Sequence, residues 1–255
     1  MDAYFIWNGI DSRTLGVIVT RYPPIVYPTE RAETTPIPGR PGFLTRTEGE
    51  GIYDGYIKTI EIGNKRWADP RAIAAWLRGP GELIIGNEPG FVYEARVLKE
   101  ASLDHLKRQV YNGSVSFMVQ PGKRKSPPEA DITVTEEDTG IYNPGDLTAR
   151  PIYTLTGSGR MILNIGPEET QSQVVINPID TSWEETLTGA IIDTDTMTVT
   201  TPDGEESLTG ITTIYRNGHH GLWIPARETV TVSAGVSDEH GELTSVKVTP
   251  RWRWL

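Results

Sequence analysis

Short β-prone runs, interrupted every few residues by Gly, Pro, Asn or Asp, recur along almost the whole of this chain. In the second half they read RPIYTLTGSGRMILNIG, SQVVINP, GAIIDTDTMTVTTPDGEESL, ETVTVSAG and LTSVKVTPRWRWL. Long stretches of helical periodicity are few, and the 255 residues include 26 Gly and 19 Pro. This rhythm predicts a mainly β protein, with a two-sheet sandwich or jelly roll in its second half.

One segment of the first half, RWADPRAIAAWLRGPGELII, is predicted to contain a helix over residues 69–77. Asp69 is a suitable N-cap, Pro70 fits the first helical position, and Gly79-Pro80 ends the helix. Its apolar face, expected to pack on a sheet, consists of Ala72, Ile73, Trp76 and Leu77. The strands predicted around it are residues 56–62, 82–85, 91–98 and 110–119.

The chain begins with a pattern typical of a β-hairpin. Residues 4–7 form an aromatic and β-branched run, Asn8-Gly9 is a turn dipeptide, and residues 15–20 are again β-branched. Pro23-Pro24 then ends the pairing, because proline has no N–H to donate to a ladder. We therefore expect a hairpin in which 4–7 pairs with 15–20.

Charge divides the chain into two parts. Residues 1–130 carry a net charge of +2, and residues 131–255 carry −12. Such an asymmetry indicates two domains, 1–130 and 131–255. Between them, QPGKRKSPPEAD at 120–131 has the composition of a solvated linker. The acidic half is not expected to bind nucleic acid, since phosphate contacts require cations.

The residues offer little catalytic chemistry. The chain has no cysteine, which excludes disulfides, zinc–thiolate sites and a cysteine nucleophile. His219-His220 fits no metal-binding motif, Asp193 and Asp195 fit a hairpin turn, and Gly157-Ser158-Gly159 fits another turn. We therefore predict no enzyme activity, no cofactor and no metal.

A sugar platform formed by Trp183 and Trp223, close to Glu184 and Arg227, is an alternative to simple packing of these rings. No basic leader and no run of transmembrane length precede or interrupt these segments, which predicts a protein made in a cytoplasm and not inserted in a membrane.

Several segments, in order, resemble the distal tail proteins of long-tailed bacteriophages. FIWNGIDSRTLGVIV, PGRPG, WLRGPGELIIGNEPGFVYEARV and YNGSVSFMVQP are similar to the N-terminal domain of that family. NPGDLTARPIYTLTGSG, LNI, IIDTDTMTV and VKVTPRWRWL are similar to its C-terminal domain. The resemblance covers most of the chain.

The resemblance implies an N-terminal split-barrel-like β domain with one short helix and an extended arm, followed by a galectin-like sandwich. It implies a homo-hexameric ring at the tail tip of the virion, assembled in the host bacterium, through which DNA passes. The implied partners are the tail tube protein, the tail-associated lysin or hub, and a receptor-binding protein. The alternative function is a carbohydrate-binding module that attaches to the host cell wall.

Residues 27–55, YPTERAETTPIPGRPGFLTRTEGEGIYDG, are the expected arm. Structureless loops beyond about 12–15 residues are uncommon in compact domains unless they have a function. A flexible surface linker is one interpretation; an arm that wraps a neighbouring subunit is the other. The expected contacts with that neighbour are made by Ile37, Arg40, Phe43, Leu44 and Ile52. The expected channel-lining residues are Glu48, Glu50 and Asp54.

Overall fold

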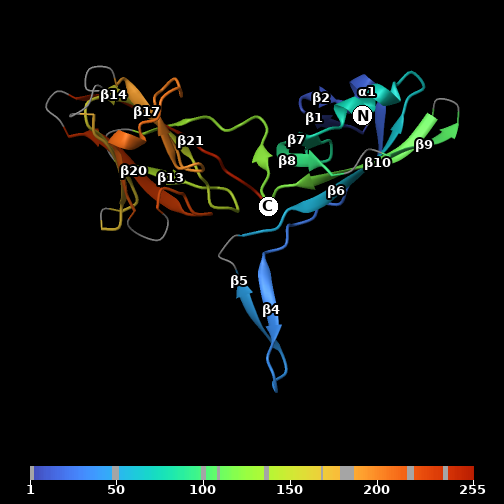
Figure 1. The fold of residues 1–255 in the computed structure, drawn as a ribbon, viewed down its shortest axis with the longest axis horizontal. Helices are drawn as coiled ribbons and strands as arrows, with labels where there is room; N and C mark the ends of the chain where they lie inside the picture. The colour runs from blue at the N-terminus through green and yellow to red at the C-terminus, as the bar shows by residue number, and fades with distance from the viewer. Residues whose placement is uncertain are drawn as a thin grey trace. The chain divides into compact units, whose positions relative to one another are not determined.

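The computed structural model describes residues 3–47, 52–98, 102–107, 110–134, 138–167, 169–178, 187–216, 221–237 and 241–255, with the backbone alone for 102–107, 110 and 111. The chain divides into two compact units, Met1–Pro127 with Leu255, and Pro128–Trp254. Both consist mainly of strands, and α1 is the one α-helix in the described ranges (Figure 1). The predicted mainly β fold is confirmed. No helix in these ranges is long and apolar enough to cross a bilayer.

The first unit contains one large antiparallel sheet, in the order β2-β1-β7-β8-β10-β6-β3. Two further strands join it, β9 beside β10 and β11 beside β8. The bounds are β1 Phe5–Trp7, β2 Ile10–Asp11, β3 Val17–Arg21, β6 Tyr56–Asn64, β7 Pro80–Ile85, β8 Phe91–Val97, β9 Ser102–Lys107, β10 Val110–Val119 and β11 Arg124–Lys125. The four strands predicted from residue 56 to residue 119 are confirmed to within two residues at each end.

The N-terminal hairpin differs from its prediction. Asn8 and Gly9 both have positive φ, 50° and 77°, as a two-residue type I′ turn requires. The strand that returns beside β1 is the short β2, and residues 12–15 form a 3-10 helix, η1 (Ser12–Leu15). β3 pairs instead with β6, at the far edge of the sheet. β1 is already flanked by β2 and β7, so it has no edge left for β3.

Helix α1, Pro70–Trp76, fills the concave side of this sheet. Asp69 accepts a hydrogen bond from the Arg71 N–H, which confirms the predicted cap. Ile73 and Leu77 are buried, and the half-buried Trp76 stacks on Phe5 with ring centroids 5.2 Å apart. Ala72, predicted on the same face, is exposed, because positions i, i+3 and i+4 from Ile73 already cover the contact.

The core beneath α1 follows the predicted alternation. Val115, Phe117 and Val119 of β10 are fully buried, and the residues between them face outward. The same inner face carries Phe5, Trp7, Ile60, Ile62, Leu83 and Ile85. Period-two alternation in β10 is therefore sufficient to separate the core face from the outer face.

The segment predicted as an arm forms a separate hairpin of β4 (Ala32–Pro36) and β5 (Phe43–Thr47), visible in blue in Figure 1. Five cross-strand pairs join the two strands, from Ala32 with Thr47 to Pro36 with Phe43. Within the described residues, neither strand pairs with any other, and every residue of both is exposed.

The second unit is a β-sandwich of two five-stranded antiparallel sheets, in the orders β12-β21-β14-β17-β18 and β13-β20-β15-β16-β19. The bounds are β12 Ile132–Val134, β13 Thr139–Tyr142, β14 Ile152–Ser158, β15 Met161–Ile165, β16 Ser172–Ile176, β17 Gly189–Asp193, β18 Thr198–Thr200, β19 Thr212–Tyr215, β20 Thr229–Val236 and β21 Glu242–Thr249, with a 3-10 helix, η2 Thr209–Ile211. Consecutive strands β14 and β15 lie in different sheets, and the inner faces of both sheets share one buried core.

Two turns predicted in this unit have different outcomes. Asp193 closes the β17–β18 turn by accepting the backbone N–H of Asp195 and Thr196, as predicted. Gly157 and Ser158, however, still belong to β14. The register against β21 shifts at Gly157, where an added Cβ would lie 2.2 Å from the Glu242 carbonyl oxygen. Glycine is therefore needed there for a β-bulge, and the turn follows it.

Candidate functional site

The arm presents two faces of different character. Residues directly opposite each other in an antiparallel pair point to the same face, and the faces alternate along each strand. The register of β4 and β5 therefore places Ala32, Thr34, Pro36, Phe43, Thr45 and Thr47 on one face. The other face carries Glu33 opposite Arg46 and Thr35 opposite Leu44. One face of the arm is thus uncharged, and the other has its charged pair toward the root.

The apolar side chains near the tip are uncovered. Phe43 is 65% exposed and Leu44 63% exposed, and they lie on opposite faces. Ile37 and Ile52, also predicted as interface residues, are each more than one-third exposed. A two-stranded ribbon has no interior, so these groups have nothing of their own to pack against. Their role in subunit contacts stays a prediction.

The root of the arm is held by backbone and charge. Arg31 donates its N–H to the Ile52 carbonyl at 2.8 Å, and Asp54 donates its N–H to the Thr29 carbonyl at 2.9 Å. Arg31 Nε also contacts Asp54 Oδ1 at 2.8 Å. Asp54, predicted to line a channel, therefore forms an ion pair at this root. Glu48 and Glu50, predicted with it, lie outside the described residues.

A buried ionic cluster lies beside Tyr93, a residue of the first unit's core. The side chain of Lys58 is only 2% exposed and that of Glu88 only 8%. Glu88 Oε1 accepts a hydrogen bond from Lys123 Nζ at 2.8 Å, and its other oxygen accepts the Tyr93 hydroxyl and lies 3.5 Å from Lys58 Nζ. Lys58 Nζ also lies 4.8 Å from the centroid of the Tyr93 ring. One carboxylate thus serves two ammonium groups, which leaves one positive charge in excess.

The ionisation of this cluster follows from its partners. Burial alone would raise the pKa of Glu88, but hydrogen bonds from Lys123 and Tyr93, with the charges of both lysines, hold that pKa below its usual value. Burial lowers the pKa of Lys58 by more than Glu88 raises it. Burial also raises the pKa of Tyr56 to about 12, helped by the charge of Glu88. Burial, together with the hydrogen bond to Glu88, raises the pKa of Tyr93 as well, so both tyrosines stay neutral at ordinary pH. Sequence reasoning did not identify this cluster.

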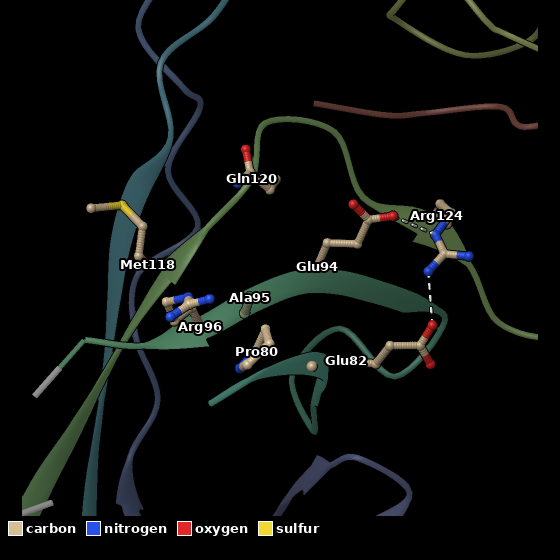
Figure 2. A pocket seen from close by; sticks show the side chains of 9 residues that line it. Pro80, Glu82, Glu94, Ala95, Arg96, Met118, Gln120 and Arg124 are labelled. Carbon is tan, nitrogen blue, oxygen red and sulfur yellow. Dashed lines mark hydrogen bonds and ion pairs between the residues drawn. The ribbon is translucent and has the colours of Figure 1, made fainter. Parts of the chain in front are cut away.

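A groove of about 560 Å³ lies on the outer face of the same sheet, and Figure 2 shows the side chains that line it. Two rows of outward side chains border it. Pro80, Arg96 and Met118 form one row across β7, β8 and β10, and Glu82, Glu94 and Gln120 form the other. The backbone of Gly81 and Ala95 lies between the rows.

Charge along the second row is unbalanced. Glu82 and Glu94 are direct cross-strand partners, an arrangement that is destabilising for two like charges. Arg124 lies between them, with Nη2 2.8 Å from Glu82 and Nε 3.4 Å from Glu94 (Figure 2). The Glu94 contact is longer than a good hydrogen bond. Two carboxylates therefore share one guanidinium.

The basic residues predicted as part of a solvated linker belong to this unit instead. Arg124 and Lys125 form β11 against β8, and Lys123 is mostly buried beside Glu88. The prediction of a free linker at these positions is wrong, because Glu82, Glu88 and Glu94 provide acidic partners that are distant in sequence.

The second unit gives limited support to a sugar platform. Trp223 donates its indole N–H to the Thr194 carbonyl at 3.0 Å, and the Arg150 guanidinium lies 4.8 Å from the ring centroid. One face of this ring is therefore already covered. Arg227, predicted nearby, pairs with Asp146 instead. Trp183 and Glu184, as well as His219 and His220, lie outside the described residues.

In the parts of the chain that are described, no three His, Asp or Glu side chains are grouped to hold a metal ion.

The fold as a whole has a counterpart among solved structures. The chain is similar to the crystal structure of the SPP1 Dit (gp 19.1) protein, presented as a paradigm of the hub adsorption apparatus in phages that infect Gram-positive bacteria. The TM-score is 0.74 with 14% sequence identity, and the match covers 100% of both chains. No family model and no curated protein matches the sequence. The resemblance to distal tail proteins that the sequence indicated is thus confirmed at the level of the fold.

Proposed function

We propose that this protein is the structural hub at the distal end of a phage tail, where six copies form a ring that joins the tail tube to the tail tip and lets DNA pass. The observation that carries the proposal is the exposed arm, in a chain whose fold matches a phage hub protein over its full length. Phe43 and Leu44 are two large apolar side chains on a ribbon without a core. Their exposure has a physical explanation if a neighbour covers them.

A closed ring would provide that neighbour to every copy. In a cyclic assembly each subunit presents one surface to the next and receives the complementary surface from the one before. Each subunit therefore donates one arm and receives one, so no arm in a closed ring is left without a neighbouring surface. The ring-forming role belongs, on this proposal, to residues 1–130, with the sandwich of 131–255 available for contacts outside the ring.

The channel function rests on charge. Residues 1–130, which would build the ring, carry a net charge of only +2, whereas residues 131–255 carry −12. A weakly charged bore would let duplex DNA pass without strong attachment, because tight non-specific binding depends on many phosphate contacts with Lys and Arg. Charges farther from the DNA than the Debye length, about 8 Å at physiological salt, are screened.

The remaining partners follow from this position in the virion. The ring would contact the tail tube protein on one side and the tail-associated lysin or hub on the other, and the sandwich would carry or contact a receptor-binding protein. The role is mechanical, and no step of it requires catalysis, a cofactor or a metal.

An arm-replacement variant tests the proposal. Residues 29–50 are exchanged for a short Gly-Ser turn, and the mass of parent and variant is measured over a range of concentrations. The parent should reach a sixfold species that appears as a ring in electron micrographs, and the variant should remain a monomer with a native-like circular dichroism spectrum. A variant that assembles as well as the parent would show that the arm does not close the ring.

The alternative, a host-wall sugar-binding module, would require Trp223 to bind a sugar ring with the face that Arg150 leaves uncovered. Binding of wall polysaccharide that is lost in Trp223→Ala, in a protein that never forms rings, would favour that alternative over the hub.

A further inference from the structure

We propose that the buried cluster around Glu88 binds a monovalent anion of halide size, such as chloride, at the ammonium group of Lys123 with Lys58 behind it. All of the residues concerned belong to the first unit. The site therefore depends neither on the ring nor on the arm.

The cluster holds more positive charge than its own carboxylate balances. Among the described residues, Glu88 is the one acidic side chain within ion-pair distance of either lysine, 3.5 Å from Lys58 Nζ and 2.8 Å from Lys123 Nζ. The side chains of Lys58 and Lys123 are only 2% and 11% exposed, so water and salt screen the excess charge poorly. A buried charge without its full counter-charge is strongly destabilising. One monovalent anion would make the cluster neutral.

The two ammonium groups also have more donors than the cluster has acceptors. One oxygen of Glu88 accepts from Lys123, and the other already accepts the Tyr93 hydroxyl where it faces Lys58. Aromatic rings lie on other sides: Lys58 Nζ is 4.8 Å from the centroid of Tyr93, and Lys123 Nζ is 4.7 Å from that of Phe91. A ring face balances part of a positive charge but is a poor hydrogen-bond acceptor. An anion would give the remaining N–H groups an acceptor.

Access to the cluster limits the size of the anion. Lys123 is the more open of the two lysines, and it directly precedes β11. Tyr56 is half-buried, with its ring centroid 5.7 Å from Lys58 Nζ. Its pKa of about 12 keeps its hydroxyl protonated, so this group is a further donor for an anion. A small anion therefore reaches the cluster past Lys123, whereas a bulky one is excluded.

A neutral Lys58 is the competing explanation of how the cluster balances its charge. Burial lowers the pKa of Lys58 by more than Glu88 raises it, and loss of the proton would also remove the excess charge. The two explanations differ in their dependence on anions. A neutral amine needs no counter-ion, whereas an anion that binds only the folded state stabilises it in proportion to its concentration.

Urea unfolding of the full chain at pH 7 distinguishes the two. Sodium bromide is exchanged for sodium gluconate, a bulky anion, at constant ionic strength. If one bromide binds the folded state, the unfolding equilibrium constant of the first unit falls about tenfold for each tenfold rise in bromide above its dissociation constant. We expect this dependence for the parent and none for Lys58→Met, which removes the excess charge.

Two further variants sharpen the result. Lys65→Met is the matched control, because it removes an exposed lysine of the same unit and should keep the bromide dependence of the parent. Glu88→Gln should show the dependence at bromide concentrations at least tenfold lower than the parent, since its two ammonium groups then lack any carboxylate. Crystals of the parent transferred to bromide should give an anomalous scattering peak in contact with Lys123 Nζ, and crystals of K58M should not.

The proposal is overturned if unfolding of the parent does not depend on bromide, and a neutral Lys58 then accounts for the charge. It is also overturned if K58M and K65M keep the same dependence, or if bromide occupies only other positions in the crystal, because the anion then binds elsewhere. None of these results bears on the ring, since assembly is not what they measure.

Discussion

The buried cluster around Glu88 should respond very differently to the removal of its negative and its positive partners. Glu88→Gln keeps the shape of the side chain but leaves Lys58, 2% exposed, without its counter-ion. Removing one partner of a buried ion pair typically costs about 3–5 kcal/mol, because the remaining charge stays desolvated. Two ammonium groups would then repel each other, so we expect a loss of about 4 kcal/mol in the free energy of unfolding of the first unit.

Lys58→Met should have the opposite character. It removes the buried ammonium and retains an unbranched apolar chain beside the Tyr93 ring. Glu88 keeps its hydrogen bonds from Lys123 and Tyr93, so no charge is left without a partner. Replacing a buried charge by an apolar group of similar volume is often neutral or stabilising. We therefore expect a change between about zero and 1 kcal/mol in favour of the folded state.

Urea unfolding of each variant, followed by tryptophan fluorescence and circular dichroism, measures both changes. The transition midpoint should move and the slope should not, because the surface exposed on unfolding is unchanged. The double variant K58M/E88Q should recover much of the loss seen in E88Q, which a double-mutant cycle quantifies. Equal losses in K58M and E88Q would refute the reasoning, because they would mean that packing, rather than the unpaired charge, sets the cost.

The pH dependence of the same unit follows from the direction of the pKa shift. The folded state holds the pKa of Glu88 below its usual value of 4.5, so the folded state binds fewer protons than the unfolded state between the two values. The stabilisation from Glu88 is therefore complete above about pH 4.5 and is lost as the pH falls through the folded-state pKa. E88Q should lack this part of the acid sensitivity.

Three further predictions concern single elements. Trp76→Ala should lower the free energy of unfolding by about 3 kcal/mol, since it removes the stack on Phe5 and the hydrogen bond to the Trp7 carbonyl. Chemical denaturation measures this change, and an unchanged transition midpoint would contradict the prediction. Gly9→Ala should cost about 1–2 kcal/mol from backbone conformation alone, because φ is 77° and no atom lies within 4 Å of the added Cβ; a loss well beyond this range would point to a steric clash instead. Burial would raise the pKa of Asp193, but Arg251 and two backbone N–H groups hold that pKa below 3.8. The stabilisation that the Asp193 carboxylate provides should therefore be lost as the pH falls below about 3.8. Asp193→Asn should cost about 1–2 kcal/mol in thermal unfolding and should lack that acid transition.

Local chemistry was sufficient to predict several elements from the sequence. Asp69 and Pro70 start α1 because a capping carboxylate and a fixed φ act within one turn of the chain. Val115, Phe117 and Val119 separate the core face of β10 because alternation is a property of a single strand. The Asx turn at Asp193 and the turn at Asn8-Gly9 were predictable for the same reason, since neither needs a partner that is distant in sequence.

Only the tertiary structure decided which segments meet. β3 has the same strand character whether it pairs with β1 or with β6, and the closed edges of β1 determine the choice. The position of Lys123 was set by Glu88, 35 residues earlier in the chain, which the local composition of a basic run cannot reveal. The groove arises from the register that places Glu82 opposite Glu94. Propensity and alternation act between neighbours in sequence, whereas pairing, burial of charge and groove formation depend on side chains that only the folded chain brings together.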